Sequence, residues 1–591
     1  MTEALDRARR AIARGDLIAA YDEAVSAIGE GDESAAIRHQ LVLALARMGD
    51  VDRAAELFGD YGLDRSDDPH HRAIGARLLK DRALVMPPGD RRLSALVAAS
   101  DAYGALFDDS GDPYPGINAA SLSALCGRND NARQIAEAIL RHPAIDDPRD
   151  YYMAATGAEA LLILGHATES EAMLRRAVTL DGADHGARST TCRQFAALAA
   201  HMGLAEGATD RLLAPIRPPR VIHYCGHMFA SDADAESALA AGIASRLAAD
   251  DVGFAYGALA AGADILIAEA MLARGGELHV VLPFAREDFV SQSVRPAGDA
   301  WVPRFERCLA AATSRTFASE MAYVGDPDQF AYGSRVAMGL AVLRAQHLGI
   351  APRQFAIWDG GAVSGSAGTG ADVATWRGRG GATDIVDPGA IDRALVRPPA
   401  EAEAQSDRAL AAILFTDFPG FSGLAETVLP SFWNGVMRHV ADVLDERGDE
   451  VLCRNSWGDA LYAVASSATA AAEIALALQH RLADFDYGAL GLSHSGGMRI
   501  GAHYGPAYRT LDRITGRTNF YGTEVSRAAR IEPVTPPGAV FVTEPFAAIL
   551  ALEAPDAYRC RYVGRIALAK RYGTYPMYRL IRADAADAAA R

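Results

Sequence analysis

Two aspartates in the last third of the chain lie where apolar segments end. Asp417 closes the run AAILFTD (411–417), and Asp459 follows Gly458 at the turn of VLCRNSWGDALYAVAS (451–466). A carboxylate beside buried strands is costly unless it is paired or binds a metal ion. If the two strands are neighbours, the carboxylates converge and could hold two divalent ions, magnesium or manganese, on a triphosphate. Two unrelated turn aspartates remain the alternative on spacing alone.

The surrounding pattern predicts an α/β domain over residues 410–581. Strands alternate with helices there, and glycine or proline marks most of the turns. The predicted elements, in chain order, are a strand at 411–417, a helix at about 425–446, a hairpin at 450–466, a helix at 470–484, a strand at 498–509, a helix carrying Arg530 within 519–538, and strand signals in 541–550 and 561–580.

The order of the motifs resembles that of class III nucleotidyl cyclases. The segments read LFTDFPGFSGL, NSWGDALYAV, MRIGAHYGP and NFYGTEVSRAARI. The family shows a phenylalanine-aspartate-isoleucine-x-glycine-phenylalanine turn, which is TDFPGF (416–421) here, and a Gly-Asp pair at a hairpin turn, here Gly458 and Asp459. The resemblance covers the whole of 410–580.

This resemblance implies a ferredoxin-like domain that dimerises head to tail, with active sites at the homodimer interface. Asp417 and Asp459 of one subunit would bind two Mg²⁺ or Mn²⁺ ions. The ribose 3′-oxygen would attack the α-phosphorus of a nucleoside triphosphate, giving a 3′,5′-cyclic nucleotide and pyrophosphate. Arg530 matches the family's transition-state arginine and would come from the other subunit, where a guanidinium suits phosphate geometry.

Other positions match the family less closely. The family places an asparagine four residues before the arginine to orient the ribose, and this chain has Ser526. A lysine in the last hairpin usually meets the outer phosphates, and LAKRYG offers Lys570 and Arg571, of which we prefer Lys570. Ordinary solvated charge is the alternative for these two.

Base selection is left open by the sequence. Adenylate cyclases of the family tend to carry lysine at the position of Asn455 and aspartate or threonine at that of Asn519, whereas guanylate cyclases carry glutamate and cysteine. A carboxamide offers donors and an acceptor, so it suits adenine, guanine or a pyrimidine. ATP is the expected substrate because adenylate cyclase is the commonest activity in the family.

Residues 218–395 predict a second α/β domain. RVIHYCGHMF (220–229) reads as a strand, and GALAAGADILIAEAMLARGGELHVVLPF (257–284) as a helix and a further strand. This stretch resembles the SLOG group of Rossmann-like domains, which implies a nucleotide ligand with Gly226 and Gly257 at strand ends near a phosphate and Glu269 as a candidate ligand residue. A second Gly-rich turn, GSAGTGADVATW (365–376), precedes another helix. A structural domain without a ligand is the alternative.

The first 213 residues predict stacked helix pairs. Segments such as AAIRHQLVLALARMGDVDRAAELFGDYG (35–62) combine an apolar helix, a Gly-Asp turn and a second helix. Such units stack as a solenoid. They resemble tetratricopeptide repeats and would bind a protein partner or support oligomerisation, with a plain helical bundle as the alternative. Pro215 to Pro219 mark the break after this block, and VRPPAEAEAQSDRA (396–409) is a predicted linker.

Composition limits the location and the partners. A formal net charge of −17 argues against nucleic-acid binding. The six cysteines have no paired spacing, no run of 18 apolar residues occurs, and the N-terminus lacks a signal peptide's apolar core. We therefore expect a cytoplasmic protein without a membrane span.

These patterns are compatible with three alternative functions. The first is an active cyclase regulated by the preceding domains. The second, favoured by Ser526 and the two asparagines, is a nucleotide-sensing scaffold with little turnover. The third is an enzyme activity in the middle domain itself.

Overall fold

The computed structural model describes residues 2–230, 233–363, 365–389, 407–483, 485–488 and 497–583. These fall into two compact units, the first holding residues up to 218 with 347–350 and the second holding 219–346 with 351–583. The division falls at the proline-rich break that the sequence predicts. Among the described helices, none is both long and apolar enough to cross a membrane.

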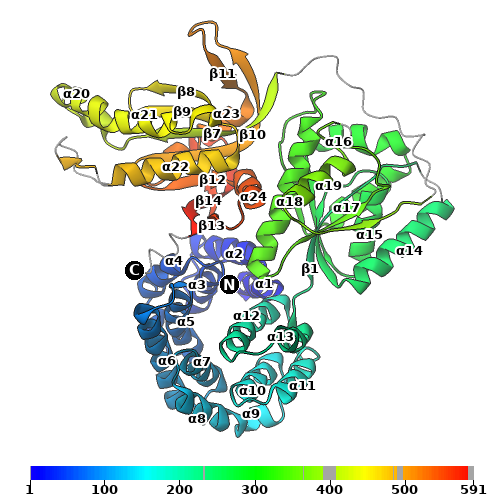
Figure 1. Cartoon of the computed structure of the whole chain (residues 1–591), viewed down its shortest axis with the longest axis vertical. Coiled ribbons are helices and arrows are strands. Elements are labelled where there is room, and N and C mark those ends of the chain that lie inside the picture. The colour runs from blue at the N-terminus through cyan, green and yellow to red at the C-terminus, as the bar shows by residue number, and fades with distance from the viewer. Residues whose placement is uncertain are drawn as a thin grey trace. The chain divides into compact units, whose positions relative to one another are not determined.

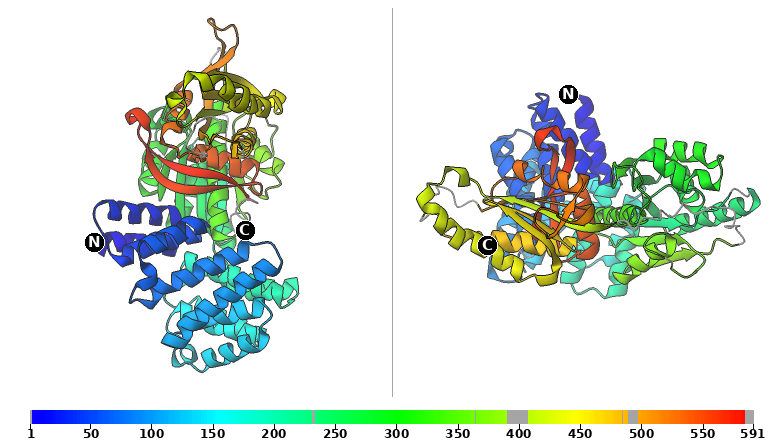
Figure 2. Two further views of the ribbon diagram at one scale, coloured as in Figure 1. Left: turned by 90° about the vertical axis from the view of Figure 1, so that its left-hand side faces the viewer. Right: turned by 90° about the horizontal axis from the view of Figure 1, so that it is seen from above.

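The first unit consists of helices that follow one another as a curved stack, blue to cyan in Figure 1 and seen from two further sides in Figure 2. Successive helices contact each other along the chain. The helices are α1 (Thr2–Arg14), α2 (Leu17–Gly29), α3 (Ala35–Arg47), α4 (Val51–Asp60), α5 (Pro69–Val85), α6 (Asp90–Ser110), α7 (Pro113–Leu125), α8 (Asn129–Leu140), α9 (Pro143–Asp146), α10 (Tyr151–Ile163), α11 (Ala167–Ala177), α12 (His185–His201) and α13 (Glu206–Leu213).

The turns between these helices explain the repeat. Gly15, with φ 71°, follows α1, and the side chain of Asp16 then accepts a hydrogen bond from the amide of Ala19 at 3.1 Å to cap α2. Gly49 and Gly165 also have positive φ at helix ends. Glycine adopts this left-handed conformation without strain, so the chain reverses within a few residues. The helical repeat architecture is confirmed.

The middle domain of the second unit is a six-stranded sheet in the order β4-β3-β2-β1-β5-β6, with every pair parallel. Because β1 has β2 on one side and β5 on the other, the strand order reverses between β1 and β5. The elements are β1 (Arg220–Gly226), α14 (Ala233–Ala249), β2 (Val252–Gly257), α15 (Ala263–Ala273), β3 (Glu277–Leu282), α16 (Arg286–Ser293), α17 (Trp301–Ala311), β4 (Ser314–Phe317), α18 (Asp328–Leu348), β5 (Arg353–Ile357), α19 (Thr369–Gly378) and β6 (Thr383–Val386). A parallel-sheet α/β domain is therefore confirmed.

The C-terminal domain is a mixed eight-stranded sheet in the order β13-β14-β12-β10-β7-β9-β8, with β11 paired to β10. Its central strands β7 and β10 are antiparallel. The elements are β7 (Arg408–Asp417), α20 (Leu429–Phe432), α21 (Arg438–Asp445), β8 (Val451–Trp457), β9 (Ala460–Ala465), α22 (Ala468–Ala483), β10 (Arg499–Leu511), β11 (Thr518–Tyr521), α23 (Thr523–Ala528), β12 (Val540–Thr543), α24 (Glu544–Glu553), β13 (Tyr558–Ala567) and β14 (Thr574–Arg582).

Three local predictions in this domain need correction. The helix expected over 425–446 is divided, because five residues in π-helical geometry (Trp433–Met437) separate α20 from α21. The second half of 541–550 is the helix α24 instead of strand, since Pro545 fits the first helical turn. Arg530 follows α23 instead of lying within it.

The predicted linker lies mostly outside the described residues, because residues 390–406 are not described. Its last part belongs to β7, which begins at Arg408. The cause is the uninterrupted apolar run after Arg408 in RALAAILF, which is typical of a buried strand.

Candidate active site

Asp417 and Asp459 are brought together by neighbouring strands. β7, which ends at Asp417, pairs with β9, and β8 joins β9 through the turn that holds Asp459. Gly458 opens this turn with φ 64°, a left-handed value that favours glycine. The amide of Phe418 donates a hydrogen bond to Oδ2 of Asp459 at 3.1 Å. The turn carboxylate is therefore attached to the end of the neighbouring strand.

The electrostatics of this pair disfavour two bare negative charges. Partial burial is the main cause that raises the pKa of Asp459 to about 6, and the charge of Asp417 is the second cause. Like charges at close range oppose ionisation, as in other carboxylate pairs. A cation between the two groups would remove this penalty.

Two further charged residues complete the cluster, and sequence reasoning missed both. Arg499, opposite Asp417 in the β10–β7 register, forms an ion pair with its carboxylate. Nε of Arg499 lies 3.0 Å from Oε1 of Glu532, and burial, then the charge of Asp417, raise the pKa of Glu532 to about 7. The signal in the sequence is a charged residue at the start of MRIGAHYGP and an acid two positions after Arg530.

This cluster fits divalent cations of the Mg²⁺ or Mn²⁺ type. Asp417 and Glu532 both contact the guanidinium of Arg499, and Asp459 lies beside Asp417, so three carboxyl groups share one nearby cation. Within the described ranges, no group of three or more His, Cys, Asp or Glu side chains could hold a metal ion. Two aspartates alone leave coordination positions for phosphate oxygens and water, which is usual for Mg²⁺ sites in phosphoryl-transfer enzymes.

A second group of predicted residues gathers around the end of α23. Ser526 is exposed on this short helix and Arg530 follows it half-buried. The amide of Ala569 donates to the carbonyl of Arg530 at 3.3 Å, so the β13–β14 turn lies beside the arginine. Lys570 and Arg571 are exposed in this turn, each with φ 58°. The structure therefore groups Arg530 with the two candidate phosphate-binding residues.

Comparison with known families identifies this domain. A sequence model described as Adenylate and Guanylate cyclase catalytic domain matches residues 404–581. Residues 404–581 are a cyclase catalytic domain. A second model, Tetratricopeptide Repeats-Sensor, matches residues 16–123 of the helical unit. No curated protein matches the chain.

Several solved structures resemble the cyclase domain. The adenylyl cyclase CyaB from P. aeruginosa is 17% identical, with a TM-score of 0.26, and the match covers 30% of this chain and 96% of that one. An adenylate cyclase structure from Trypanosoma brucei is 23% identical, with a TM-score of 0.26 and coverage of 30% and 90%. The guanylate cyclase domain of RhGC from Catenaria anguillulae, in complex with GTP, is 15% identical, with a TM-score of 0.25 and coverage of 30% and 99%.

The two asparagines expected to contact the base lie on β8 and β11 of the cyclase domain. Oδ1 of Asn455 accepts from the amide of Ser456 at 2.9 Å, and Oδ1 of Asn519 accepts from the amide of Phe520 at 2.8 Å. Sγ of Cys453 lies 3.8 Å from Oδ1 of Asn519, which places the start of β8 beside β11. Both carbonyl oxygens thus accept from the main chain, and Nδ2 of Asn519 donates to Oδ2 of Asp512 at 3.4 Å.

A buried ionic network supports α23 of the cyclase domain. The carboxylate of Glu524, 2% exposed, contacts Nε2 of His503 at 2.9 Å and Nη1 of Arg527 at 3.0 Å. It also accepts a hydrogen bond from Ser319 of the middle domain at 3.0 Å. Burial opposes ionisation, but the hydrogen bond from His503 and the charge of Arg527 hold the pKa of Glu524 below its ordinary value. The helix that precedes Arg530 is thus attached to both domains of the second unit.

The residues predicted for the middle domain are not all brought together. Gly226 ends β1 and lines a pocket, whereas Gly257 ends β2 and packs against Tyr224, whose carbonyl oxygen would lie 2.6 Å from an added Cβ. Glu269 lies on α15 in an ion pair with Arg304, whose nitrogens are 2.6 and 2.9 Å from its oxygens. The pocket is instead lined by three acids that were not among the predicted site residues, Asp264, Asp359 and Asp372.

Proposed function

We propose that the C-terminal domain converts a nucleoside triphosphate, with ATP as the first candidate, into a 3′,5′-cyclic nucleotide and pyrophosphate. The convergence of Asp417 and Asp459 at the end of β7 is the observation that carries this proposal. The charge repulsion in this pair gives a physical reason for cation binding there. The active form is a homodimer in which each site takes residues from two copies.

Each group has a defined part in the reaction. Asp417 and Asp459 would hold the divalent ions, which when bound activate the 3′-hydroxyl and neutralise phosphate charge. Arg530, from the second copy, binds the α-phosphate and stabilises the charge that develops on it. Lys570, or Arg571 beside it, holds the outer phosphates, and Ser526 orients the ribose through its hydroxyl.

The test is product formation by the full-length chain. Purified protein is incubated with ATP, GTP, CTP or UTP and Mn²⁺, and the products are identified by mass. We expect one 3′,5′-cyclic nucleotide as the main product, and Asp417→Ala should lower its rate of formation at least ~100-fold because cation binding fails.

Asp449→Asn is the matched control. This aspartate is exposed in the turn before β8 and lies outside the carboxylate cluster, so activity should be unchanged. The absence of cyclic product from all four triphosphates, or full activity in Asp417→Ala, would contradict the proposal.

A nucleotide-binding scaffold with little turnover is the second candidate. The exposed serine at position 526, which replaces the ribose-orienting asparagine implied by the family resemblance, favours it. In that case triphosphate binding is measurable by calorimetry, and no product accumulates in any of the four reactions.

A further inference from the structure

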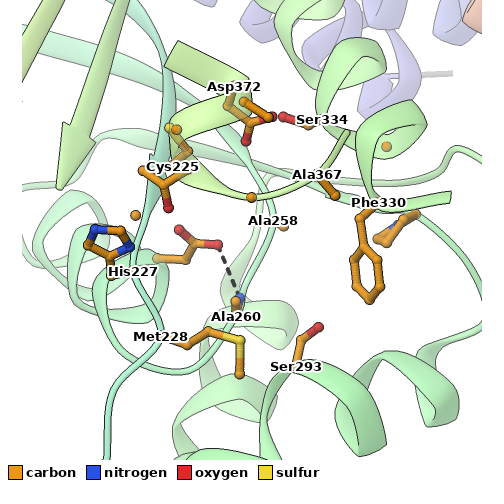
Figure 3. Close-up of a pocket in the computed structure, with 18 of the residues that line it drawn as sticks. Cys225, His227, Met228, Ala258, Ala260, Ser293, Phe330, Ser334, Ala367 and Asp372 are labelled. Atoms are coloured by element: carbon orange, nitrogen blue, oxygen red, sulfur yellow. Dashed lines mark hydrogen bonds between the residues drawn. The ribbon is translucent and has the colours of Figure 1, made fainter. Parts of the chain in front are cut away.

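The middle domain contains a pocket of about 1170 Å³ at the carboxyl ends of its parallel strands (Figure 3). Its walls come from the segment after β1, the segment after β5 and the start of α18. This is the point where the strand order reverses, the usual position of ligands in open parallel sheets. The pocket lies in a different domain from the carboxylate cluster of the cyclase site.

One carboxyl oxygen in this pocket has no hydrogen-bond partner among the described residues. Asp264, at the start of α15, is 6% exposed, and its Oδ2 accepts from the amide of Ala260 at 3.2 Å, the contact dashed in Figure 3. Its Oδ1 is buried and has no hydrogen-bond partner among the described residues. A buried polar atom without a partner is costly, so a bound donor group would stabilise it. Burial raises the pKa of this carboxyl to about 8.

The charges of the pocket indicate the class of ligand. Asp264, Asp372 and Asp359 line it, and no lysine or arginine is among the described residues that do. Asp372 interacts with Ser334, which Figure 3 shows beside it, and burial raises the pKa of Asp372 to about 7. Triphosphate groups need several cationic partners, so this lining disfavours them. It suits a ligand that presents N–H and O–H groups to carboxyl oxygens.

Aromatic side chains provide an apolar part of the pocket lining. Phe330 and Tyr323 line the pocket with ring centroids 5.4 Å apart, and Phe289 and Trp358 line it as well. Aromatic rings stack on flat heterocycles, and this stacking contributes to affinity whichever base the ligand carries. A flat, uncharged ring compound with amine and hydroxyl groups therefore fits both the acidic and the aromatic side chains that line the pocket.

We propose that this pocket is a regulatory site for an uncharged nucleoside-type ligand, whose donors are bound by Asp264 and Asp372. The effect on turnover rests on the proposed cyclase function, whereas the binding itself does not. Helix α18 is the element through which occupancy reaches the cyclase domain.

The contacts of α18 support this connection. Phe330, Gly333 and Ser334 line the pocket, while the hydroxyl of Tyr332, on the same turns, donates to the carbonyl of Tyr504 in β10 at 2.8 Å. Further along, Gly339 approaches α24 so closely that an added Cβ would lie 2.0 Å from the carbonyl oxygen of Ala548. A shift of α18 on ligand binding must therefore displace β10 or α24, because no space separates them.

Binding is tested on the full chain carrying Asp417→Ala, so that turnover is absent. Adenosine, guanosine, cytidine, uridine and ATP are titrated by calorimetry. We expect at least one nucleoside to bind ~10-fold or more tightly than ATP, because no lysine or arginine is among the described residues that line the pocket. Asp264→Asn replaces one carboxyl oxygen by an amide N–H donor. It should therefore weaken the binding of that nucleoside at least ~10-fold.

Ala367→Leu is the second variant, because it adds bulk to the pocket wall without touching either acid, and it should weaken the nucleoside similarly. Asp299→Asn, exposed and outside the pocket, should leave binding unchanged. The proposal is overturned if no nucleoside binds, if ATP binds more tightly at a site sensitive to Asp264→Asn, or if neither pocket variant weakens binding.

In the chain with Asp417 intact, saturating nucleoside should change the rate of cyclic nucleotide formation, and Asp264→Asn should remove that change. An unchanged rate despite binding overturns the connection through α18.

Discussion

Asp459 lies where a free carboxylate is disfavoured and a cation-bound one is not. It is half-buried at a turn, bonded to the amide of Phe418 and next to Asp417. Glu532 is in a similar position, with Arg499 as the nearby positive charge. Repulsion between these carboxylates destabilises the metal-free folded state, and bound divalent ions would remove this repulsion. We therefore expect divalent ions to increase the free energy of unfolding.

The metal-free protein should lose stability as the pH rises from about 4 to 7. The pKa of Asp459 is raised to about 6 and that of Glu532 to about 7, so the folded state binds more protons than the unfolded state in this window. The free energy of unfolding therefore falls as pH rises there. Thermal melts in chelator across this range measure it, and Mn²⁺ should restore stability at pH 7.

Asp459→Asn should make this pH dependence shallower, because one of the two groups no longer titrates. Asp449→Asn keeps both groups and should match the wild-type slope. A wild-type protein whose melting temperature rises steadily with pH from 4 to 7 in chelator would show that these carboxyl groups do not carry raised pKa values.

Asn455→Glu should shift the base preference toward GTP. A glutamate accepts hydrogen bonds from the N1–H and N2 amine of guanine, whereas it repels the N1 acceptor of adenine. We expect the ratio of kcat/KM for GTP over ATP to rise ~10-fold or more, since polar mismatches discriminate strongly. Arg454→Ala, on the same strand and exposed, is the control. An unchanged ratio would mean that Asn455 does not contact the base.

Helix α23 is a short element supported by buried charge. Glu524 contacts His503, Arg527 and Ser319, and the ring nitrogen Nδ1 of His503 lies 2.7 Å from Oγ1 of Thr543. Six residues of helix contribute little stability by themselves. The position of Arg530 after this helix therefore depends on the network around Glu524.

Glu524→Ala should destabilise the second unit by ~3–5 kcal/mol, because the substitution leaves Arg527 without its buried carboxylate partner. Denaturant unfolding monitored by tryptophan fluorescence measures the change. Glu450→Ala, exposed in the turn before β8, should change stability by no more than ~0.5 kcal/mol. A loss below ~1 kcal/mol for Glu524→Ala would show that the network is not structural.

At the level of the whole molecule, we propose that the complete site takes residues from two chains. Within one chain, Asp417 pairs with Arg499, whereas Arg530 lies beside the β13–β14 turn. A homodimer with twofold symmetry would pair each cluster with the arginine of the other copy. Catalysis is then linked to any change that alters how the copies associate.

Mixing Asp417→Ala with Arg530→Ala should restore activity that neither variant has alone. Random pairing makes half of the dimers mixed, and each mixed dimer holds one intact site, so about one quarter of wild-type activity is expected. Cyclic nucleotide formation at equal concentrations of the two variants measures it. A mixture as inactive as its components would favour a site built within one chain.

Much of the architecture followed from local pattern. The hairpin around Asp459 was predicted from two apolar runs and a Gly-Asp turn, and the repeats from helix periodicity with glycine at the ends. The division of the helix over 425–446 was missed, because its apolar spacing is helical and the π-helical residues carry no signal of their own. The helical half of 541–550 was missed because apolar residues run through both the strand and the helix.

The sequence by itself determined the order of most elements and the position of most candidate residues at a strand end, a turn or a helix. These features depend on hydrophobic period and on backbone preferences, which act over a few residues. Only the tertiary structure decided which of them meet. Arg499 joins Asp417 to Glu532, and Ser319 meets Glu524, because sheet register and domain packing bring together residues that are far apart in the chain.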